Sequence, residues 1–170
     1  MPALALVSSD RAGQDGGMVR PRLAASAQDF AEAAALQADF NREYDSPTLE
    51  PDDLAAHLSR LSAGGDTRVW LVGTPALGHG LVRLRTQTTV DELEGYLAEF
   101  YVVPDRRGQG LGSILLQAII DDLRSLGATY LDLNTSEDDD SARAIYEKFG
   151  FDCHEGRGSG PLAIYYELDL

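Results

Sequence analysis

Residues 104–116 read PDRRGQGLGSILL, in which two arginines and three glycines lead directly into an apolar run with helical spacing. A strand-like segment, EFYVV at 99–103, comes immediately before this stretch. Glycines let a backbone approach a ligand closely, and the first N–H groups of a helix have no partners within the helix. A strand, a glycine-rich loop and a helix N-terminus in this order are typical of a binding site for an anion such as pyrophosphate.

The spacing of this loop excludes two familiar phosphate-binding motifs. A Walker A loop needs a lysine after its second glycine, and the single lysine of this chain is Lys148. A dinucleotide-binding G-x-G-x-x-G motif needs a third glycine where the sequence has Ser113. The actual spacing, Arg107-x-x-Gly110-x-Gly112, either holds an anion or is a glycine-rich turn with incidental arginines.

Helical and strand-like periods alternate on both sides of the loop. Residues 1–17 lack any period and are expected to form a disordered tail, followed by a single domain at 18–170. The order of elements indicates an α/β or α+β domain around a mixed sheet. The pattern predicts strands at 18–26, 67–74, 80–87, 95–103, 129–135, 151–157 and 162–170, and helices ending near Tyr44, starting at Pro51, and at 110–126 and 141–149.

Length and hydropathy restrict the class of protein. The 170 residues fit one domain with a sizeable core, and no apolar stretch approaches the roughly 20 residues that a membrane span needs. The first ten residues lack the basic start and the apolar length of a signal peptide. We therefore expect a cytoplasmic protein without membrane partners.

Charge restricts the partners in turn. The net charge is −14, from 28 acidic and 14 basic residues. A surface this acidic disfavours nucleic acid and attracts cations, although the same surplus of acids also keeps a protein soluble. The charge therefore fits a cationic substrate without requiring one.

Cysteine and histidine give no sign of a metal site or a disulfide. Cys153 is the single cysteine, so no intrachain disulfide is possible, and a small half-buried residue is the simplest interpretation. His57, His79 and His154 are too scattered for a metal-ligand pattern, and we expect no metal.

Two motifs together resemble the GNAT superfamily of acyl-CoA N-acyltransferases. They are R-x-x-G-x-G in RGQGLG (107–112), preceded by the strand EFYVVP, and the later AIYEKFGF (144–151). The resemblance covers about residues 18–170 through the order of elements. It implies a GNAT-like mixed, mostly antiparallel sheet of about six to seven strands flanked by about four helices.

The resemblance also implies acetyl-CoA as the acyl donor. The loop amides would bind its pyrophosphate, and free backbone groups on the preceding strand would pair with its pantetheine arm. Asn134 stands where some members carry a glutamate base, and Asp139 where a cofactor-binding asparagine is frequent; the Asp139 carboxylate cannot donate a hydrogen bond but can cap a helix. The cofactor-binding residues implied are Tyr101, Val102, Val103, Arg107, Gly108, Gln109, Gly110, Leu111, Gly112, Ser113, Asn134 and Asp139.

Two residues are candidates for the chemistry. Tyr146 matches the family tyrosine taken as general acid to the coenzyme A sulfur, and a phenol with a pKa near 10 is protonated at pH 7. The alternative is an aromatic ring packed in the core. Leu97, Glu99 and Tyr101 are predicted to share one face of their strand, and Glu99 is the candidate base. The alternative is that Glu99 is an exposed or ion-paired glutamate.

The acceptor is the least determined part of the prediction. In the family, substrate-binding residues come from the first two helices and the loop between them, which here contains Glu43, Tyr44 and Asp45; Glu99 joins them. These residues suit a cationic small-molecule amine that attacks directly in a ternary complex. A protein N-terminus or lysine, and a non-catalytic acyl-CoA-binding domain, are the alternatives. A homodimer through the last strand, or a monomer, fits the sequence equally.

Overall fold

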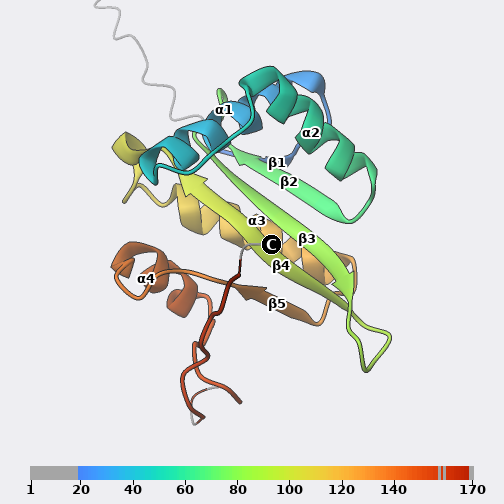
Figure 1. Cartoon of the computed structure of the whole chain (residues 1–170), viewed down its shortest axis with the longest axis vertical. Helices are drawn as coiled ribbons and strands as arrows, with labels where there is room; N and C mark the ends of the chain where they lie inside the picture. Colours follow the sequence, from blue (N-terminus) through green and yellow to red (C-terminus); the bar gives the residue numbers. More distant parts are fainter. Residues whose placement is uncertain (1–18, 157, 159, 169–170) are drawn as a thin grey trace, which may run out of the picture.

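A five-stranded sheet forms the centre of the structure, a computed structural model that describes residues 19–156, 158 and 160–168 (Figure 1). The expected tail at 1–17 lies outside these residues. The strands follow one another across the sheet in chain order, antiparallel at each junction except the parallel pair β4–β5. They are β1 (Pro21–Leu23), β2 (Thr67–Val72), β3 (Gly78–Thr86), β4 (Leu93–Val102) and β5 (Tyr130–Leu133).

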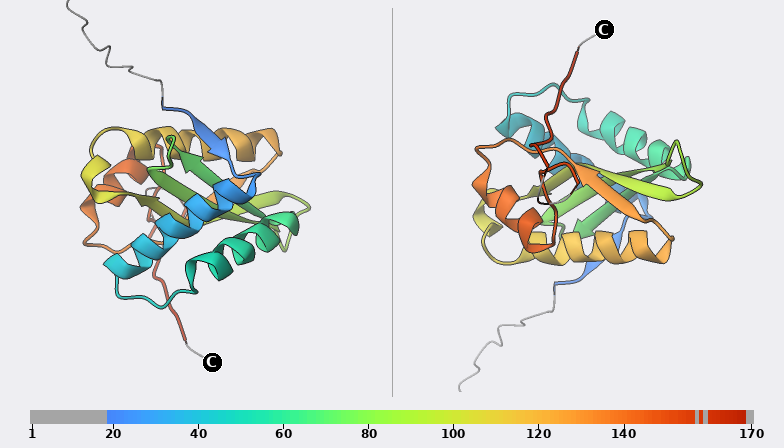
Figure 2. Two further views of the ribbon diagram at one scale, coloured as in Figure 1. Left: turned by 90° about the horizontal axis from the view of Figure 1, so that it is seen from above. Right: turned by 90° about the horizontal axis from the view of Figure 1, so that it is seen from below.

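Four helices cover the two faces of this sheet (Figure 2). Helices α1 (Ala27–Glu43) and α2 (Pro51–Ala63) pack on one face, where their leucines and alanines meet Val69, Leu71 and Leu81. Helices α3 (Leu111–Ser125) and α4 (Asp140–Lys148) pack on the other face. None of the helices in the described ranges has both the length and the apolar character needed to cross a bilayer.

Local sequence signals set the helix ends. Ser26 and Asp29 form a reciprocal capping box, in which the Ser26 hydroxyl accepts from the Asp29 N–H at 3.1 Å and an Asp29 oxygen accepts from the Ser26 N–H at 3.0 Å. Pro51 opens α2 at its first position, and Gly127 follows α3 with φ at 81°. The mixed α/β fold with four helices, predicted from the sequence, is confirmed.

The expected six or seven strands are corrected to five in the part of the chain that the structure describes. The two predicted closing strands, at 151–157 and 162–170, were wrong in the part of them that the structure describes. That part forms only an isolated bridge between His154 and Leu162. Gly156 and Gly158 adopt positive φ there, so the backbone turns between the two apolar runs and neither run joins the sheet.

A β-bulge in β4 reorients the strand at its middle. Leu81 on β3 pairs with Glu99, but its neighbour Val82 pairs with Leu97, so Ala98 has no partner. Leu97 consequently joins the core under α3, while Tyr101 joins the core under α1 and α2. Glu99 lies opposite Leu81 and shares its face and that of Tyr101. The predicted common face of Leu97, Glu99 and Tyr101 is therefore wrong for Leu97.

A histidine is buried in the sheet beneath α1. His79 on β3 is 1% exposed, and neither ring nitrogen has a hydrogen-bond partner within the described residues. Its closest aromatic neighbour is Tyr101, with ring centroids 6.4 Å apart. Burial lowers the pKa of His79 to about 4, so the ring is neutral at pH 7.

This burial predicts a loss of stability in mild acid. The unfolded chain binds a proton on His79 near pH 6.5, whereas the folded chain does so only near pH 4, so stability falls as the pH falls between these values. The full pKa difference corresponds to about 3 kcal/mol. Urea unfolding between pH 7 and pH 4 should show that His79→Leu loses less stability than the wild type. Equal slopes in the two proteins would contradict the account.

Candidate active site

The sheet opens where β4 and β5 part. Their parallel pairing ends at Leu97 and Leu133, and β4 continues to Val102 with no strand on that side among the described residues (Figure 1). On the β3 side, the Val103 N–H donates to the Leu77 carbonyl at 3.0 Å. Because backbone groups alternate in an antiparallel ladder, Val102 and Phe100 direct theirs toward the open side. The backbone groups of β4 beyond Leu97 on this side are therefore unpaired, and this open edge between β4 and β5 is called the crevice below.

The glycine-rich loop follows β4 and supplies a run of free amides. Residues Pro104–Arg106 form a 3-10 turn, and α3 begins at Leu111 after Gly110. The first N–H of this region with a helical partner is that of Ile114, which donates to the Gly110 carbonyl. Within the described part of the chain, the N–H groups of residues 108–113 have no hydrogen-bond acceptor. Six successive free amides at a helix N-terminus are able to hold an anion.

Each glycine of the loop has a separate structural reason. Gly108 and Gly110 adopt φ of 75° and 84°, which residues with a side chain rarely adopt. At Gly112 the φ is ordinary, but a β-carbon would lie 3.1 Å from Ile145 Cδ1 and 3.7 Å from the Phe100 ring. The first two glycines therefore set the direction of the amides, and the third brings α3 close to α4.

The Arg107 side chain points away from these amides. Its guanidinium donates to both Glu43 carboxylate oxygens, at 2.9 and 2.7 Å, and Nε donates to the Val102 carbonyl at 2.9 Å. It also lies over the Tyr101 ring, 5.5 Å from the centroid. The hydrogen bond with Arg107 lowers the pKa of Glu43. Arg107 thus joins the end of α1 to the glycine-rich loop and covers the Val102 carbonyl on the open side of β4.

Tyr146 lies on α4, on the α3 side of the sheet. Its side chain is 8% exposed and packs against Phe100 and Phe151, with ring centroids 6.0 and 5.8 Å away. Burial, assisted by the charge of Asp139, raises the pKa of Tyr146 to about 12. The phenol is therefore protonated at neutral pH. Both the acid role and the packing role that the sequence allowed are compatible with this position.

Glu99 lies on the opposite face of the sheet, toward α1. Burial raises the pKa of its carboxyl, and the amide of Gln37 on α1 acts in the opposite direction. Gln37 is itself buried; its Nε2 donates to Asn41 at 2.9 Å, while its Oε1 has no partner in the described part of the structure. Glu99 is therefore a half-buried carboxyl beside one polar side chain of α1, and it makes no ion pair within the described residues.

Two other predicted residues, Asp139 and Asn134, lie at the start of α4 and directly after β5. An Asp139 oxygen accepts from the Ala142 N–H at 3.0 Å and from the Ser141 hydroxyl at 2.9 Å, so Asp139 caps α4. Asn134 follows β5 directly, and its amide donates to the Tyr96 hydroxyl at 3.1 Å. Tyr101 and Val103 direct their backbone toward β3, so Val102 is the member of that trio that faces the crevice.

The end of α1 and the start of α4 form an acidic rim at the crevice. Burial raises the pKa of Tyr44, and the charges of Asp139 and Glu43 raise it further. Asp139 also raises the pKa of Glu43, against the stronger effect of Arg107. Asp45 follows with φ of 52° and an exposed side chain. Two of the three predicted substrate residues, Glu43 and Tyr44, therefore lie close enough to the α4 cap to feel the charge of Asp139.

One exposed group has the composition of a metal site but lies elsewhere in the chain. The side chains of Asp152, Cys153 and His154 lie within 4.8 Å of one another, and His154 Nδ1 lies 2.9 Å from an Asp152 oxygen. Cys153 is exposed, where the sequence suggested a half-buried residue. The prediction that the protein needs no metal stays a prediction.

Sequence reasoning missed Gln37 and the partner of Arg107. Gln37 interrupts the apolar face of a helix rich in alanine and leucine, and that interruption is the signal that could have drawn attention to it. The pairing of Arg107 with Glu43 joins residues 64 positions apart and has no local signal.

Comparison with known proteins now gives the family. The sequence profile of the Acetyltransferase (GNAT) family matches residues 31–151, which contain the loop, the crevice and Tyr146. The chain belongs to the GNAT acetyltransferase family. Its enzyme class is therefore N-acetyltransferase, as the two motifs predicted.

Three relatives illustrate how far the similarity extends. The crystal structure of a provisionally assigned acetyltransferase from Arthrobacter sp. FB24 is 39% identical, with a TM-score of 0.76 over 87% of this chain and 94% of that one. N-alpha-acetyltransferase 30 from Schizosaccharomyces pombe is 39% identical over 59 residues, which are 35% of this chain and 39% of that protein. An aminoglycoside acetyltransferase, meta-AAC0020, from an uncultured soil metagenomic sample, solved with sisomicin, shares the fold at 18% identity and a TM-score of 0.70, over 89% of this chain and 97% of that one.

The amide run predicts a difference between two glycines with the same geometry. Gly110 and Gly127 have φ of 84° and 81°, and a β-carbon on either would meet nothing within 4 Å. Alanine at either position should cost about 1–2 kcal/mol of stability, because both sites are left-handed. Only Gly110→Ala also redirects the loop amides, so calorimetry should give about tenfold weaker binding of coenzyme A for this variant alone. Equal affinities in the two variants would contradict the role of the loop.

Proposed function

We propose that this protein uses acetyl-CoA to acetylate a primary amine, with a cationic small molecule as acceptor. The observation that carries the proposal is the run of six unpartnered amides at residues 108–113, next to a crevice with unpaired backbone groups. The free amides fit the pyrophosphate of coenzyme A, which needs hydrogen-bond donors. The unpaired edge of β4 fits the amide-rich arm of coenzyme A, which can pair with a strand edge. When bound, acetyl-CoA supplies an acetyl group activated as a thioester.

The two candidate catalytic residues approach the crevice from opposite faces of the sheet. Tyr146 comes from the α3 side and Glu99 from the α1 side. A donor on one side and an acceptor on the other can meet in a ternary complex, without a covalent acyl-enzyme. Tyr146 holds a proton up to a pKa of about 12 and is suited to donate it to a leaving thiolate.

The acceptor must lose a proton before it attacks. An alkylammonium with a pKa near 10.4 is neutral in only a small fraction of molecules at pH 7. Deprotonating it at this pH costs roughly 4.6 kcal/mol of free energy. A partly desolvated carboxyl, such as that of Glu99, has a raised pKa and is a better base than an exposed one. We assign Glu99 to accept this proton, directly or through water.

The acidic rim favours a cation as acceptor. Glu43, Asp138 and Asp139 all act on Tyr44 electrostatically, and Arg107 is the positive charge among them. The net charge of −14 adds a long-range attraction for cations. An amine bearing several positive charges matches this rim better than a neutral amine.

A second acceptor class has one observation in its favour. The 59-residue similarity to N-alpha-acetyltransferase 30 makes a protein N-terminus the alternative acceptor. A basic peptide would also suit an acidic rim, so charge alone does not separate the two classes.

The experiment that separates them is a thiol-release assay with acetyl-CoA and two acceptor panels. One panel contains polyamines and aminoglycosides, and the other contains peptides with free N-termini. The proposal predicts turnover with the small cations and kcat/KM at least tenfold above that for any peptide. Turnover restricted to peptides would replace it with the second class, and no turnover with either panel would contradict acetyl transfer to amines.

Two variants test the assigned roles. Tyr146→Phe and Glu99→Gln should each lower kcat by about 10²-fold or more, since general acid and base groups contribute at that level. The pH profiles should differ. The pKa of Glu99 is raised above 4.5, so the acidic limb of kcat/KM reports its deprotonation and should disappear in Glu99→Gln but persist in Tyr146→Phe. An unchanged acidic limb in Glu99→Gln would assign the base elsewhere.

A further inference from the structure

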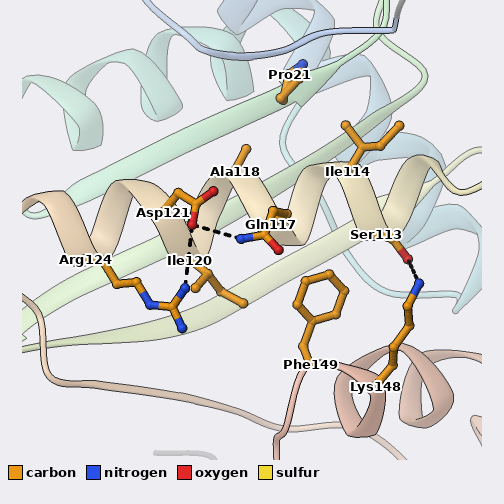
Figure 3. A pocket seen from close by; sticks show the side chains of 10 residues that line it. All are labelled: Pro21, Ser113, Ile114, Gln117, Ala118, Ile120, Asp121, Arg124, Lys148 and Phe149. Carbon is orange, nitrogen blue, oxygen red and sulfur yellow. Dashed lines mark hydrogen bonds and ion pairs between the residues drawn. The ribbon is translucent and has the colours of Figure 1, made fainter.

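Gln37 is a buried polar side chain with one unsatisfied atom. It lies on α1 and is 7% exposed, and its Oε1 has no hydrogen-bond partner among the described residues. Two other helical glutamines, Gln28 and Gln117, are exposed, and each donates to a carboxylate one turn along its helix, at 3.1 and 2.8 Å. Figure 3 shows the pair of Gln117, in a groove of about 830 Å³ on the outer side of α3. Gln37 differs from both, because an amide oxygen buried without a partner costs stability and calls for a reason.

A chain of hydrogen bonds fixes the direction of the Gln37 amide. Asn41 Nδ2 donates to the Pro47 carbonyl at 3.2 Å, in the loop between α1 and α2. The Asn41 side chain therefore presents its oxygen to Gln37, whose Nε2 donates to it at 2.9 Å. Because an amide oxygen only accepts hydrogen bonds, Gln37 must turn its Nε2, and not its Oε1, toward Asn41. The loop after α1 thus sets the orientation of Gln37.

The second hydrogen of the same nitrogen serves Glu99. An amide nitrogen carries two hydrogens, and Asn41 accepts one of them. Glu99 lies opposite Leu81, on the sheet face that α1 covers. Burial raises the pKa of the Glu99 carboxyl, and a hydrogen bond from Gln37 lowers it. One nitrogen therefore donates to both Asn41 and Glu99, and the oxygen of the same amide is left buried without a partner.

Charged side chains do not compete with Gln37 for Glu99. The titratable groups on the same sheet face are His79 on β3 and Tyr101 on β4. His79 is neutral at pH 7, and burial raises the pKa of Tyr101. In the described part of the chain, the pKa of Glu99 responds to burial and to Gln37 alone. The charged groups that act on the pKa of Tyr101, and not on that of Glu99, are Glu43, Asp39, Arg107 and Arg42.

We propose that Gln37 is a positioning residue for Glu99, held by Asn41 and Pro47 so that its Nε2 donates to the Glu99 carboxylate. The inference rests on the proposed function, in which Glu99 is the base. The donated hydrogen bond stabilises the ionised carboxylate, which is the form that accepts a proton from the amine. It also links the base to the loop after α1, where Tyr44 and Asp45 are predicted to bind the acceptor.

A ¹³C NMR titration of the glutamate side-chain carboxyls tests this link without any turnover, and Glu99→Gln assigns the signal. Gln37→Met keeps the length of the side chain and removes the donor, so the pKa of Glu99 should rise by about one pH unit. Asn41→Leu should raise it by less, since the Gln37 amide is then free to turn. The double variant should match Gln37→Met, because Asn41 acts through Gln37.

Gln28→Met is the matched control for this titration. It removes a glutamine donor from a carboxylate on the same helix, that of Glu32, and should leave the pKa of Glu99 unchanged. A thermal melt should confirm that each variant remains folded.

The pH profile gives a second readout that a packing role would not move. With an amine acceptor, the acidic limb of kcat/KM should move to higher pH in Gln37→Met by the same amount as the pKa of Glu99. The plateau above that limb should stay close to the wild-type value, because Glu99 is ionised there in both proteins. A lower plateau with the limb in its original place would reduce Gln37 to a packing residue and overturn the inference.

The outcomes also separate this inference from the proposed function. An unchanged pKa of Glu99 in Gln37→Met overturns the inference, even where amines are acetylated. A raised pKa without a matching move of the acidic limb supports the hydrogen bond and contradicts Glu99 as the base. If no amine is acetylated, the proposed function fails, and the NMR titration still decides whether Gln37 donates to Glu99.

Discussion

The unpaired edge of β4 beyond Leu97 is the constraint on which the rest of the site depends. Backbone N–H and C=O groups away from bulk water need partners, and β5 stops supplying them at Leu133. Arg107 satisfies the Val102 carbonyl, and the remaining groups on this side are open to a ligand that can pair like a strand. The bulge at Ala98 lies at the same point and turns Glu99 toward α1. The amides of the loop, Tyr146 and Glu99 are all arranged around this gap.

The backbone amides and the net charge of this molecule act on ligands of opposite charge. A chain of net charge −14 repels an anionic ligand at long range, so the anion must be bound by short-range groups. Free amides at the start of α3 provide them without any net charge, and Arg107 is neutralised by Glu43. The acids at the end of α1 and the start of α4 act in the opposite sense, on cations. Donor and acceptor are thereby attracted to different parts of one crevice.

Much of the fold was predictable because its signals are local. The capping box at Ser26, Pro51 at the start of α2 and Gly127 after α3 each act within a few residues. The loop, with its strand before and helix after, was predictable for the same reason. The closing strands were not, since an alternating apolar pattern fixes the faces of a strand but not whether a partner edge is available. The bulge at Ala98 is set by pairing with β3, which the sequence of β4 does not encode alone.

The most direct test of the account is an amide NMR titration of the ¹⁵N-labelled protein with coenzyme A. The account predicts the largest shift changes at the N–H groups of residues 108–113 and of Val102, because these are the groups it leaves free for the ligand. It also predicts that Val103, whose N–H is bonded to Leu77, changes little. Binding with the largest changes elsewhere, and with residues 108–113 unaffected, would contradict the central claim.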